Sequence, residues 1–454
     1  MDAFIRSLPD HEFVLWTISD LESSRGKFVY DLPKNVTAVH ENFLGSSFKL
    51  RINKNPNIKF TQQEREAISQ MISCGNPDWR VVLDSFNLNV NKPVEFFLSE
   101  EFLDILKEFS RKQFPFAGYK DLFWTVRSMY LPLLYLIGQP MPEADLYHSP
   151  STGYAGVLAA LGSMKYDKPF VLTEHGIYTR EREEEILRSD WVVSYFKDYW
   201  ISMFFMFARL AYQRAHRVTS LYRRASLIQQ ELGCPPEKCD IVPNGLMAKS
   251  FASIPPKPKD DWIDIAAIVR FAPIKDIKTM IYGFYRLKQD VENVRLHIVG
   301  GIDDDEYYQE CLDLIKYLDI KDIIIPGSVN IRSYMEKIDF TILTSISEGQ
   351  PFALLESMAA KRPVIATDVG CCRELLEGDA SDDLGLAGYC VPPMHQSRLL
   401  QALVQMCRNE NGRKAMGEVG QKRVNKYFEI ENTMKTYLQV YEKAVAAWQG
   451  SASN

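Results

Sequence analysis

Six short apolar runs between residues 263 and 391 alternate with segments of helical periodicity, and this alternation limits the fold more than any other sequence feature. The runs are Ile263–Val269, Val294–Val299, Ile323–Ile325, Phe340–Leu343, Val364–Thr367 and Gly388–Val391. Buried runs of this length separated by helices are typical of a parallel sheet with helices on both faces. The second half of the chain is therefore predicted to be a doubly wound α/β domain.

The first half of the chain shows a similar but less regular alternation. Its β-rich runs are Glu12–Ile18, Val36–Val39, Asp145–Ser149, Phe170–Thr173, Val218–Leu221 and Asp240–Val242. We predict a first α/β domain over residues 1–246 with a helical insertion near 51–140, and a proline-rich linker over 247–262. The second domain then covers 263–429, and a last helix, 430–454, returns to the first domain.

Composition describes an ordinary globular chain. With 454 residues, 46% of them hydrophobic and 25% charged, the chain has room for two or three domains. A net charge of -6 argues against general nucleic-acid binding. The eight cysteines lack metal-type spacing, and the first ten residues lack the apolar core of a signal peptide, so we expect a cytosolic protein.

One apolar segment, Tyr199–Tyr212, could be mistaken for a membrane span. It is shorter than the roughly 20 residues that a span requires, and it contains Arg209. We expect a buried core helix, with an interfacial helix or a docking face as the alternatives.

The stretch from Ser345 to Ala359 is the strongest candidate for a binding site. It follows an apolar run and contains Glu348 in a predicted turn and Glu356 in a predicted helix. Ligands bind at the carboxyl ends of parallel strands, so both carboxylates are expected to face one crevice. The alternative is a surface loop with solvated glutamates.

The residues between the two glutamates favour a sharp turn into a helix. Gly349 permits conformations closed to other residues, and Pro351 suits a helix start. The free N–H groups of Gln350, Phe352 and Ala353 would point at an oxygen-rich ligand. Carboxylates beside such donors suit a polyol, because each sugar hydroxyl can both donate and accept.

Other polar residues also follow predicted strands. Arg270 and Lys275 come after the run that ends at Val269, where two cations could neutralise a diphosphate or could simply be solvated. Gly327 and Ser328 come after Ile323–Ile325, as backbone contacts to a ligand or as an ordinary turn.

In the first half, His175 ends a buried run and precedes a glycine, with Arg180 close behind, so a substrate contact is favoured over a structural role. His148 has the same strand-end placement, and both roles stay open for it. The acidic run Asp303–Asp305 has no histidine nearby and is interpreted as a solvated turn, so no metal site is predicted.

Together these motifs resemble the retaining glycosyltransferases of family 4, which have the GT-B fold of two Rossmann-like domains facing across a cleft. The resemblance rests on Glu348 and Glu356 with Gly349–Phe352 between them, on Arg270 with Lys275, on Val242–Gly245, and on Pro363–Gly370 followed by Glu374. It covers about residue 140 to the end. The segment Thr173–Arg182 further resembles PelF-type enzymes of Pel exopolysaccharide synthesis.

The resemblance implies a role for each matching residue. Arg270 and Lys275 would hold the diphosphate of a UDP-sugar, Glu356 the ribose, and Glu348 the transferred hexose. His175 would contact that sugar near the leaving phosphate, with His148 and Arg180 on the acceptor or sugar side. UDP-glucose is the favoured donor and a growing polysaccharide or other glycan the acceptor, and transfer would need no cofactor or metal.

Two further expectations come from the same resemblance. The chain starts after the first strand and glycine-rich loop of related enzymes, which motivates an alternative: a catalytically impaired, nucleotide-sugar-binding subunit of a polysaccharide synthase complex. An epimerase of the same fold is a weaker third possibility. The protein would be cytoplasmic, would work at the inner face of the cell membrane with membrane-bound polysaccharide-synthesis proteins, and would bind no nucleic acid.

Overall fold

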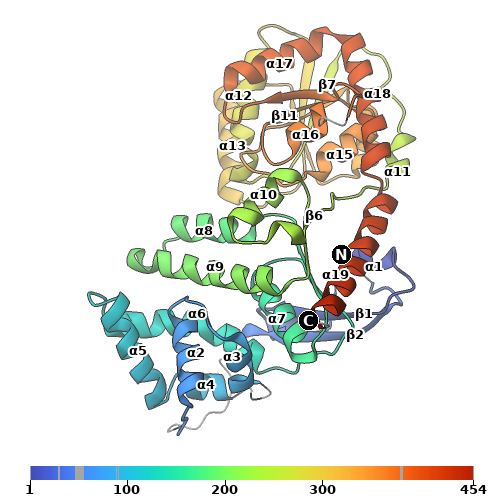
Figure 1. The fold of residues 1–454 in the computed structure, drawn as a ribbon. Helices are drawn as coiled ribbons and strands as arrows, with labels where there is room; N and C mark the ends of the chain where they lie inside the picture. The colour runs from blue at the N-terminus through green and yellow to red at the C-terminus, as the bar shows by residue number, and fades with distance from the viewer. Residues whose placement is uncertain are drawn as a thin grey trace. The chain divides into compact units, whose positions relative to one another are not determined.

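The computed structural model describes residues 2–28, 31–45, 56–87, 89, 91–378 and 382–452. The chain forms two compact units (Figure 1). Unit 1 consists of Met1–Ser220, Ser226–Ile241 and Tyr437–Asn454, and unit 2 of Leu221–Ala225 and Val242–Thr436. Most of the last helix, α19 (Ile430–Ala452), therefore belongs to unit 1, although the helix begins in unit 2.

Unit 2 is built on a six-stranded parallel sheet, and all six runs predicted for it are strands. They are β7 (Ile263–Ile268), β8 (Val294–Val299), β9 (Ile323–Gly327), β10 (Phe340–Leu343), β11 (Val364–Thr367) and β12 (Gly388–Val391). Their spatial order is β12-β11-β10-β7-β8-β9. The chain thus adds strands to one side of β7 and then to the other, and the order reverses between β7 and β10. Such a reversal opens a crevice at the strands' carboxyl ends, where ligands bind.

The helices of unit 2 bury their apolar stripes against this sheet. They include α12 (Ile277–Leu287), α13 (Asp305–Tyr317), α15 (Phe352–Ala359), α16 (Cys372–Glu377), α17 (Gln396–Arg408) and α18 (Glu410–Tyr427). Helix α12 packs on α13 and α17, while α15 packs on α16 and α18. The buried side chains form one core in which β-branched strand residues such as Ile265 and Ile298 meet helix residues such as Ile281. The prediction of a doubly wound domain is confirmed.

Unit 1 has two parallel sheets within the described residues. One contains β3 (Tyr147–Ser149), β4 (Phe170–Glu174), β5 (Arg217–Ser220) and β6 (Cys239–Ile241) in that order. The other pairs β1 (Phe13–Ser19) with β2 (Val36–Phe43). All six predicted runs are strands, but the sequence pattern suggested a single sheet. Periodicity reports that a strand is buried and does not specify its partner, so the separation is a tertiary feature.

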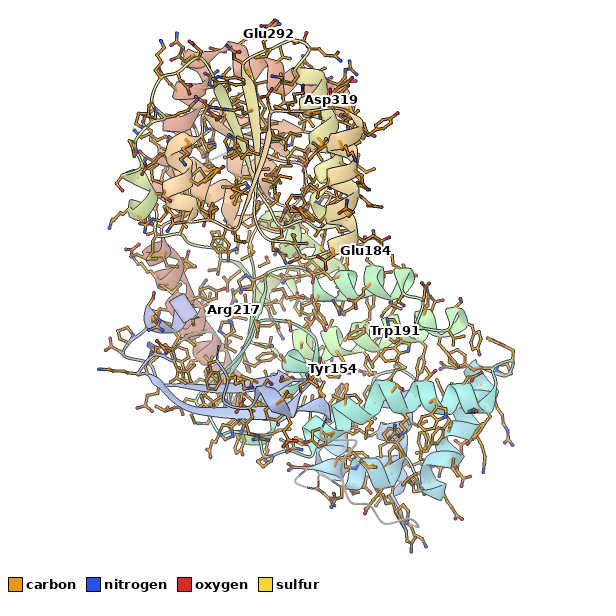
Figure 2. The ribbon with its side chains drawn as sticks, turned by 180° about the vertical axis from the view of Figure 1, so that it is seen from behind. Tyr154, Glu184, Trp191, Arg217, Glu292 and Asp319 are labelled. Atoms are coloured by element: carbon orange, nitrogen blue, oxygen red, sulfur yellow. The ribbon has the colours of Figure 1, made fainter. Side chains whose placement is uncertain are left out.

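The described part of the predicted insertion is mostly helical, and its helices belong to unit 1. Unit 1 contains α1 (Asp2–Arg6), α2 (Gln62–Ile72), α3 (Trp79–Phe86), α4 (Lys92–Phe96), α5 (Glu100–Gln113), α6 (Tyr119–Ile137), α7 (Tyr154–Tyr166), α8 (Tyr178–Arg188), α9 (Lys197–Arg214), most of α10 (Arg223–Glu231) and most of α19. Figure 2 marks Tyr154, which begins α7, and Trp191, between α8 and α9. Helices α3 and α6 pack on α7, so the insertion shares its core with the sheet-bearing part of unit 1.

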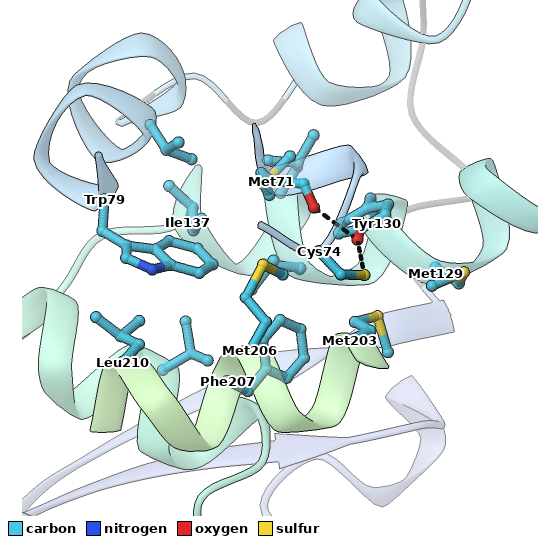
Figure 3. Packing of buried hydrophobic residues seen from close by; sticks show 14 of the residues in the cluster. Met71, Cys74, Trp79, Met129, Tyr130, Ile137, Met203, Met206, Phe207 and Leu210 are labelled. Carbon is cyan, nitrogen blue, oxygen red and sulfur yellow. Dashed lines mark hydrogen bonds between the residues drawn. The ribbon is translucent and has the colours of Figure 1, made fainter. Parts of the chain in front are cut away.

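Helix α9 confirms the prediction of a buried core helix. Met203, Met206 and Phe207 are at most 1% exposed and pack against the insertion helices (Figure 3). Arg209, the cation that argued against a membrane span, donates to the carbonyl oxygens of Cys74 and Gly75, both at 2.9 Å. Across the described ranges, no helix combines the length and apolar character needed to cross a membrane.

Candidate functional site

The loops after β7 and β10 meet where the strand order of unit 2 reverses. Lys275 ends a short 3₁₀ helix after β7, and Glu348 lies in the turn after β10. The Nζ atom of Lys275 donates to Oε1 of Glu348 at 2.6 Å, and the two side chains are only 17% and 11% exposed. The structure therefore brings together two predicted site residues that are 73 positions apart.

Hydroxyl groups at the end of β10 hold this pair in place. Ser345 Oγ donates to Oε1 of Glu348 at 2.6 Å, so this oxygen accepts from a hydroxyl and an ammonium group. Thr344 Oγ1 donates to the carbonyl oxygens of Lys275 and Asp276, both at 3.0 Å. Thr344 lies just outside the stretch predicted as a binding site, and Ser345, the first residue of that stretch, was given no role of its own. The available signal was a pair of hydroxyl residues directly after a buried strand, at a sheet edge where ligands bind.

A glycine from the next loop fixes the backbone of the Glu348 turn. Gly370 has φ +56, and a Cβ atom there would lie 2.3 Å from the carbonyl oxygens of both Glu348 and Gly349. The neighbouring Cys371 N–H donates to the Gly349 carbonyl at 3.1 Å. Only glycine fits this left-handed conformation and this close approach without strain. Ser345 and Lys275 therefore fix the side chain of Glu348, while Gly370 and Cys371 fix its backbone.

The start of α15 supplies backbone donors next to Glu348. Pro351 is the N-cap, and its carbonyl accepts from the Leu354 N–H at 3.1 Å. The N–H groups of Phe352 and Ala353, at the first two helical positions, have no acceptor within the helix. Helix N-termini of this kind attract oxygen-rich and anionic groups. The Phe352 side chain is 48% exposed, so the approach to these donors is open on its side.

Gln350 has a structural bond that its predicted role did not include. Its Oε1 accepts from the backbone N–H of Asn244 at 2.6 Å, which ties the turn to the beginning of unit 2. Its Nε2 is buried and has no acceptor among the described residues. An unpaired buried amide donor is costly unless a ligand or water accepts from it.

Glu356 differs from Glu348 in its lack of a protein partner. It lies on α15 with a half-buried side chain, and within the described ranges its carboxylate makes no hydrogen bond or ion pair. Burial raises the pKa of this carboxyl group. A half-buried carboxylate without a donor is well suited to accept hydrogen bonds from a ligand.

Arg270 has a carboxylate partner that the sequence analysis did not anticipate. Its side chain is 64% exposed and forms an ion pair with Asp303. The neighbouring Asp304 caps α13, because its Oδ1 accepts from the Tyr307 N–H at 2.9 Å. Asp303 and Asp305 are exposed, as the prediction of a solvated turn requires, and the structure adds specific partners for Asp303 and Asp304.

Gly327 and Ser328 lie beside a glycine pair that the sequence analysis missed. The Gly300 N–H donates to the Gly327 carbonyl at 3.1 Å, and a Cβ atom on Gly301 would lie 3.3 Å from Ser328 Oγ. A Cβ atom on Gly300 would lie 2.0 Å from the Val269 carbonyl oxygen. The ends of β7, β8 and β9 thus approach closely, and two consecutive glycines after an apolar run were the signal.

In unit 1, His175 directly follows β4 and is exposed. The preceding residue, Glu174, is a buried acid whose carboxylate accepts several hydrogen bonds. Glu174 is 1% exposed and accepts from Tyr212 OH at 2.7 Å, Gln229 Nε2 at 3.0 Å and Thr152 Oγ1 at 3.3 Å. Burial raises its pKa. The sequence analysis passed over Glu174, although an acid at the end of a buried strand is itself unusual.

His148 and Arg180 have protein partners within unit 1. The two ring nitrogens of His148 are each hydrogen-bonded at 2.8 Å, to Tyr441 OH and to Thr173 Oγ1. Burial, and secondarily the nearby His175, lower the pKa of His148 to about 4. Arg180 is exposed and lies 3.6 Å from a carboxylate oxygen of Glu231. The roles of His148 and Arg180 toward a sugar stay predictions.

Acidic and thiol side chains do not assemble into a metal centre in the described part of the chain. No group of three or more His, Cys, Asp or Glu side chains there has an arrangement that could hold a metal ion.

Comparison with known families now places the two halves of the chain. Residues 1–237, more than half of the chain, match the family model described as a domain of unknown function, DUF3492. The chain belongs to the DUF3492 family. Residues 263–409, which contain β7 to β12 and both glutamates, match the model of the glycosyl transferases group 1. The DUF3492 protein thus carries a group 1 glycosyltransferase domain.

Individual relatives agree with this assignment at low identity. The DUF3492 protein is 24% identical over 282 residues to an MMP alpha-(1->4)-mannosyltransferase of Mycolicibacterium hassiacum. The aligned region covers 61% of this chain and 66% of the relative. It is 27% identical over 184 residues to a putative colanic acid biosynthesis glycosyltransferase of Escherichia coli K12, covering 38% and 43%. The chain therefore spans less than two thirds of the length of these curated relatives.

Solved structures confirm the predicted GT-B fold. The sucrose-phosphate synthase of Thermosynechococcus elongatus superposes with a TM-score of 0.61 at 14% identity, covering 98% of this chain and 92% of that one. Anabaena HepE in complex with UDP-glucose gives a TM-score of 0.52 at 17% identity, covering 66% and 78%. At such identities the likeness shows the fold alone.

Proposed function

We propose that this DUF3492 protein is a retaining glycosyltransferase of family 4 that transfers a hexose from a UDP-sugar, with UDP-glucose as the first choice, to a growing polysaccharide or other glycan. The observation that carries the proposal is the cluster at the strand reversal of unit 2. There the Lys275 ammonium and the Glu348 carboxylate are 2.6 Å apart, next to the start of α15, the helix that also carries Glu356.

The two cations are assigned to the donor diphosphate. Both follow the central strand β7, and each is paired with a carboxylate, Arg270 with Asp303 and Lys275 with Glu348. A diphosphate offers these side chains charge-assisted acceptors that together carry more negative charge than a single carboxylate. As the bond to the sugar breaks, negative charge grows on the leaving phosphate, and cations already in place stabilise it.

The two glutamates divide the hydroxyl groups of the donor between them. Glu356 has free acceptor capacity and is assigned to the ribose, whose neighbouring hydroxyls can both donate to one carboxylate. Glu348, oriented by Ser345 and Lys275, is assigned to the transferred hexose together with the N–H groups of Phe352 and Ala353. Gly327 and Ser328 would contact the base or the ribose from the end of β9.

The proposed transfer takes place on one face of the sugar. A hydroxyl oxygen of the acceptor forms a bond to the anomeric carbon while the bond from that carbon to the phosphate oxygen breaks. The leaving phosphate takes the proton of the acceptor hydroxyl, so the anomeric configuration is kept. This route requires neither a protein nucleophile nor a metal, and His175 would stabilise the sugar near the departing phosphate.

The finer assignments rest on sequence resemblance. The segment Thr173–Arg182 supports a PelF-type enzyme of exopolysaccharide synthesis, and the similar proteins include a mannosyltransferase and a putative colanic acid glycosyltransferase. We accordingly propose a cytoplasmic enzyme that works at the inner face of the cell membrane with membrane-bound polysaccharide-synthesis proteins.

Measurement of UDP release tests the proposal directly. The protein is incubated with UDP-glucose, UDP-galactose and UDP-N-acetylglucosamine, with and without EDTA, and UDP is quantified over time. Release with one donor, unchanged by EDTA and lost in Glu348→Gln and Lys275→Ala, is expected. Lys278→Ala is the matched control, because this exposed lysine pairs with Glu310 on α13 and should leave the rate unchanged. Wild-type release no greater than that of both site variants would refute catalysis.

The same protein samples distinguish the alternative of a catalytically impaired, nucleotide-sugar-binding subunit. Calorimetry that shows UDP binding without release from any donor would favour it. One motivation for this alternative was that Tyr199–Tyr212 could be a docking face, but Met203 and Phe207 of α9 are fully buried in the core of unit 1. The enzyme is therefore the better-supported function.

A further inference from the structure

Two cysteines of unit 1, outside the proposed site, lie with their sulfur atoms 3.6 Å apart. Cys234 follows α10, and Cys239 is the first residue of β6. A short 3₁₀ turn, Pro236–Lys238, folds the chain back between them, and the Pro235 carbonyl lies 3.8 Å and 3.6 Å from the two sulfurs. We propose that Cys234 and Cys239 form a redox modification site that closes to a disulfide by exchange with a small-molecule disulfide.

The surroundings of the two sulfurs differ in a way that suits exchange. Cys234 is 2% exposed, whereas Cys239 is partly exposed. The hydrogen bond between the two thiols lowers the pKa of Cys239, with help from the Ser226 hydroxyl and Arg217. The same bond, together with burial, raises the pKa of Cys234. Cys239 is thus the thiolate that attacks at neutral pH, and Cys234 is the thiol that resolves.

The other six cysteines, all within the described ranges, do not share these properties. They are also free thiols, and burial raises the pKa of each of them. They are Cys74, Cys311, Cys371, Cys372, Cys390 and Cys407. Cys390 is the useful comparison, because it is also partly exposed but has its pKa raised to about 12. Oxidation is therefore expected to be selective for the Cys234–Cys239 pair.

The exchange balances without any group from the proposed active site. The Cys239 thiolate attacks one sulfur of oxidised glutathione, forms a mixed disulfide and releases one glutathione thiolate. Cys234 then attacks the Cys239 sulfur, and its proton passes to the second glutathione as that thiolate leaves. Two protein thiols and one glutathione disulfide become one protein disulfide and two glutathione thiols.

The two sulfur atoms need only a small movement to reach bonding distance. A disulfide requires sulfurs about 2.05 Å apart, so each sulfur would move by less than about 1 Å. The turn is anchored on both sides, since the Cys234 N–H donates to the Gln229 carbonyl at 2.9 Å and Cys239 pairs with Val218 of β5. Gln229 also donates to Glu174, so Gln229 links the cysteine pair to the buried acid that precedes His175.

Differential alkylation of the full-length protein tests the inference. The protein is equilibrated in glutathione buffers of increasing oxidising strength, quenched with acid and alkylated, and the peptide containing both cysteines is quantified by mass spectrometry. In oxidised protein we expect neither cysteine of this peptide to be alkylated, and the peptide mass to be two hydrogens lower than that of the reduced, unalkylated form. In reduced protein at neutral pH, Cys239 should be alkylated faster than Cys390, because the pKa of Cys239 is lowered and that of Cys390 is raised.

Three variants keep the outcome decisive. Cys234→Ser should leave Cys239 trapped as a stable glutathione adduct, Cys239→Ser should leave Cys234 unmodified, and the control Cys390→Ser should oxidise like wild type. The inference is overturned if both cysteines remain alkylated in the most oxidising buffer. It is equally overturned if Cys234→Ser yields no adduct, or if other cysteines are oxidised first. Circular dichroism of each variant establishes that it is folded before alkylation.

Discussion

Replacing Asp264 by asparagine should strongly destabilise unit 2, because the change removes a buried charge that several basic side chains share. Asp264 is the second residue of β7 and is 1% exposed. Its carboxylate accepts from Arg295 at 2.6 Å and 2.8 Å and from His297 at 2.8 Å, and it pairs with Lys257 at 2.5 Å. The asparagine side chain keeps the shape but removes the charge that holds these three groups.

The size of the stability loss depends on how far Arg295, His297 and Lys257 are left without a charged partner. Breaking a buried ion pair from one side costs about 3–5 kcal/mol, and the lower end applies because an amide oxygen still accepts one bond. Lys257 also keeps Asp260 at 2.7 Å and Asp339 at 3.1 Å. We therefore expect a loss of about 3 kcal/mol in the free energy of unfolding of unit 2. For a unit of about 200 residues, this lowers the melting temperature by roughly 6–12 °C.

Calorimetry of the full chain at neutral pH measures the effect, with Asp260→Asn as the matched control. Asp260 binds the same lysine but is 44% exposed, so its loss should cost less than about 1 kcal/mol. A deficit in Asp264→Asn no larger than that of the control would refute the reasoning.

The pH dependence gives the prediction a second test. Burial alone would raise the pKa of Asp264, but hydrogen bonds from His297, Arg295 and Lys257 outweigh it and hold the pKa well below its usual range. A depressed pKa contributes stability above the unfolded value of about 3.9, and this contribution is lost as pH falls below it. The difference between wild type and Asp264→Asn should therefore shrink below about pH 4. A difference that grows on acidification would contradict the assignment.

Three further variants probe the two units. Glu356→Gln should weaken UDP binding about tenfold in calorimetry and abolish the preference for UDP over 2′-deoxy-UDP. If the variant prefers UDP as strongly as wild type does, Glu356 does not bind the ribose. Gly370→Ala should displace the Glu348 turn, because φ is +56 and a Cβ would meet two carbonyl oxygens at 2.3 Å; UDP release should fall at least tenfold, and unchanged release would contradict this. Tyr212→Phe removes the 2.7 Å donor to buried Glu174 and should cost unit 1 about 1–3 kcal/mol in urea unfolding; a neutral effect would argue against the network.

The positions of the strands could be predicted from the sequence, because strands that are buried on both faces are short runs of mostly apolar residues. Parallel strands covered by helices have near-continuous apolar runs, and runs such as Ile263–Val269 and Phe340–Leu343 are strands in unit 2 within one residue. The same local logic predicted that polar residues after these runs gather at one edge. Lys275 and Glu348 follow neighbouring strands and are in contact, although what they bind stays a prediction.

Partnership across long sequence distances was decided only by the tertiary structure. The sequence marked His148 as a strand-end histidine, but Tyr441, 293 residues later, occupies one of its nitrogens. It marked Asp303 as a solvated acid, whereas Arg270 pairs with it. It showed only that the cysteines lack metal-type spacing, whereas a turn brings two of their sulfur atoms within 3.6 Å of each other.

The reason for this division is physical. Hydrophobic periodicity and turn chemistry are properties of a few neighbouring residues, so the sequence by itself determined the strands, most helices and the edge at which polar groups collect. The strand order, the separate β1–β2 sheet and the partner of each charged side chain depend on which distant segments pack together. Those choices lower the free energy of the whole unit rather than of any one segment, and only the folded structure displays them.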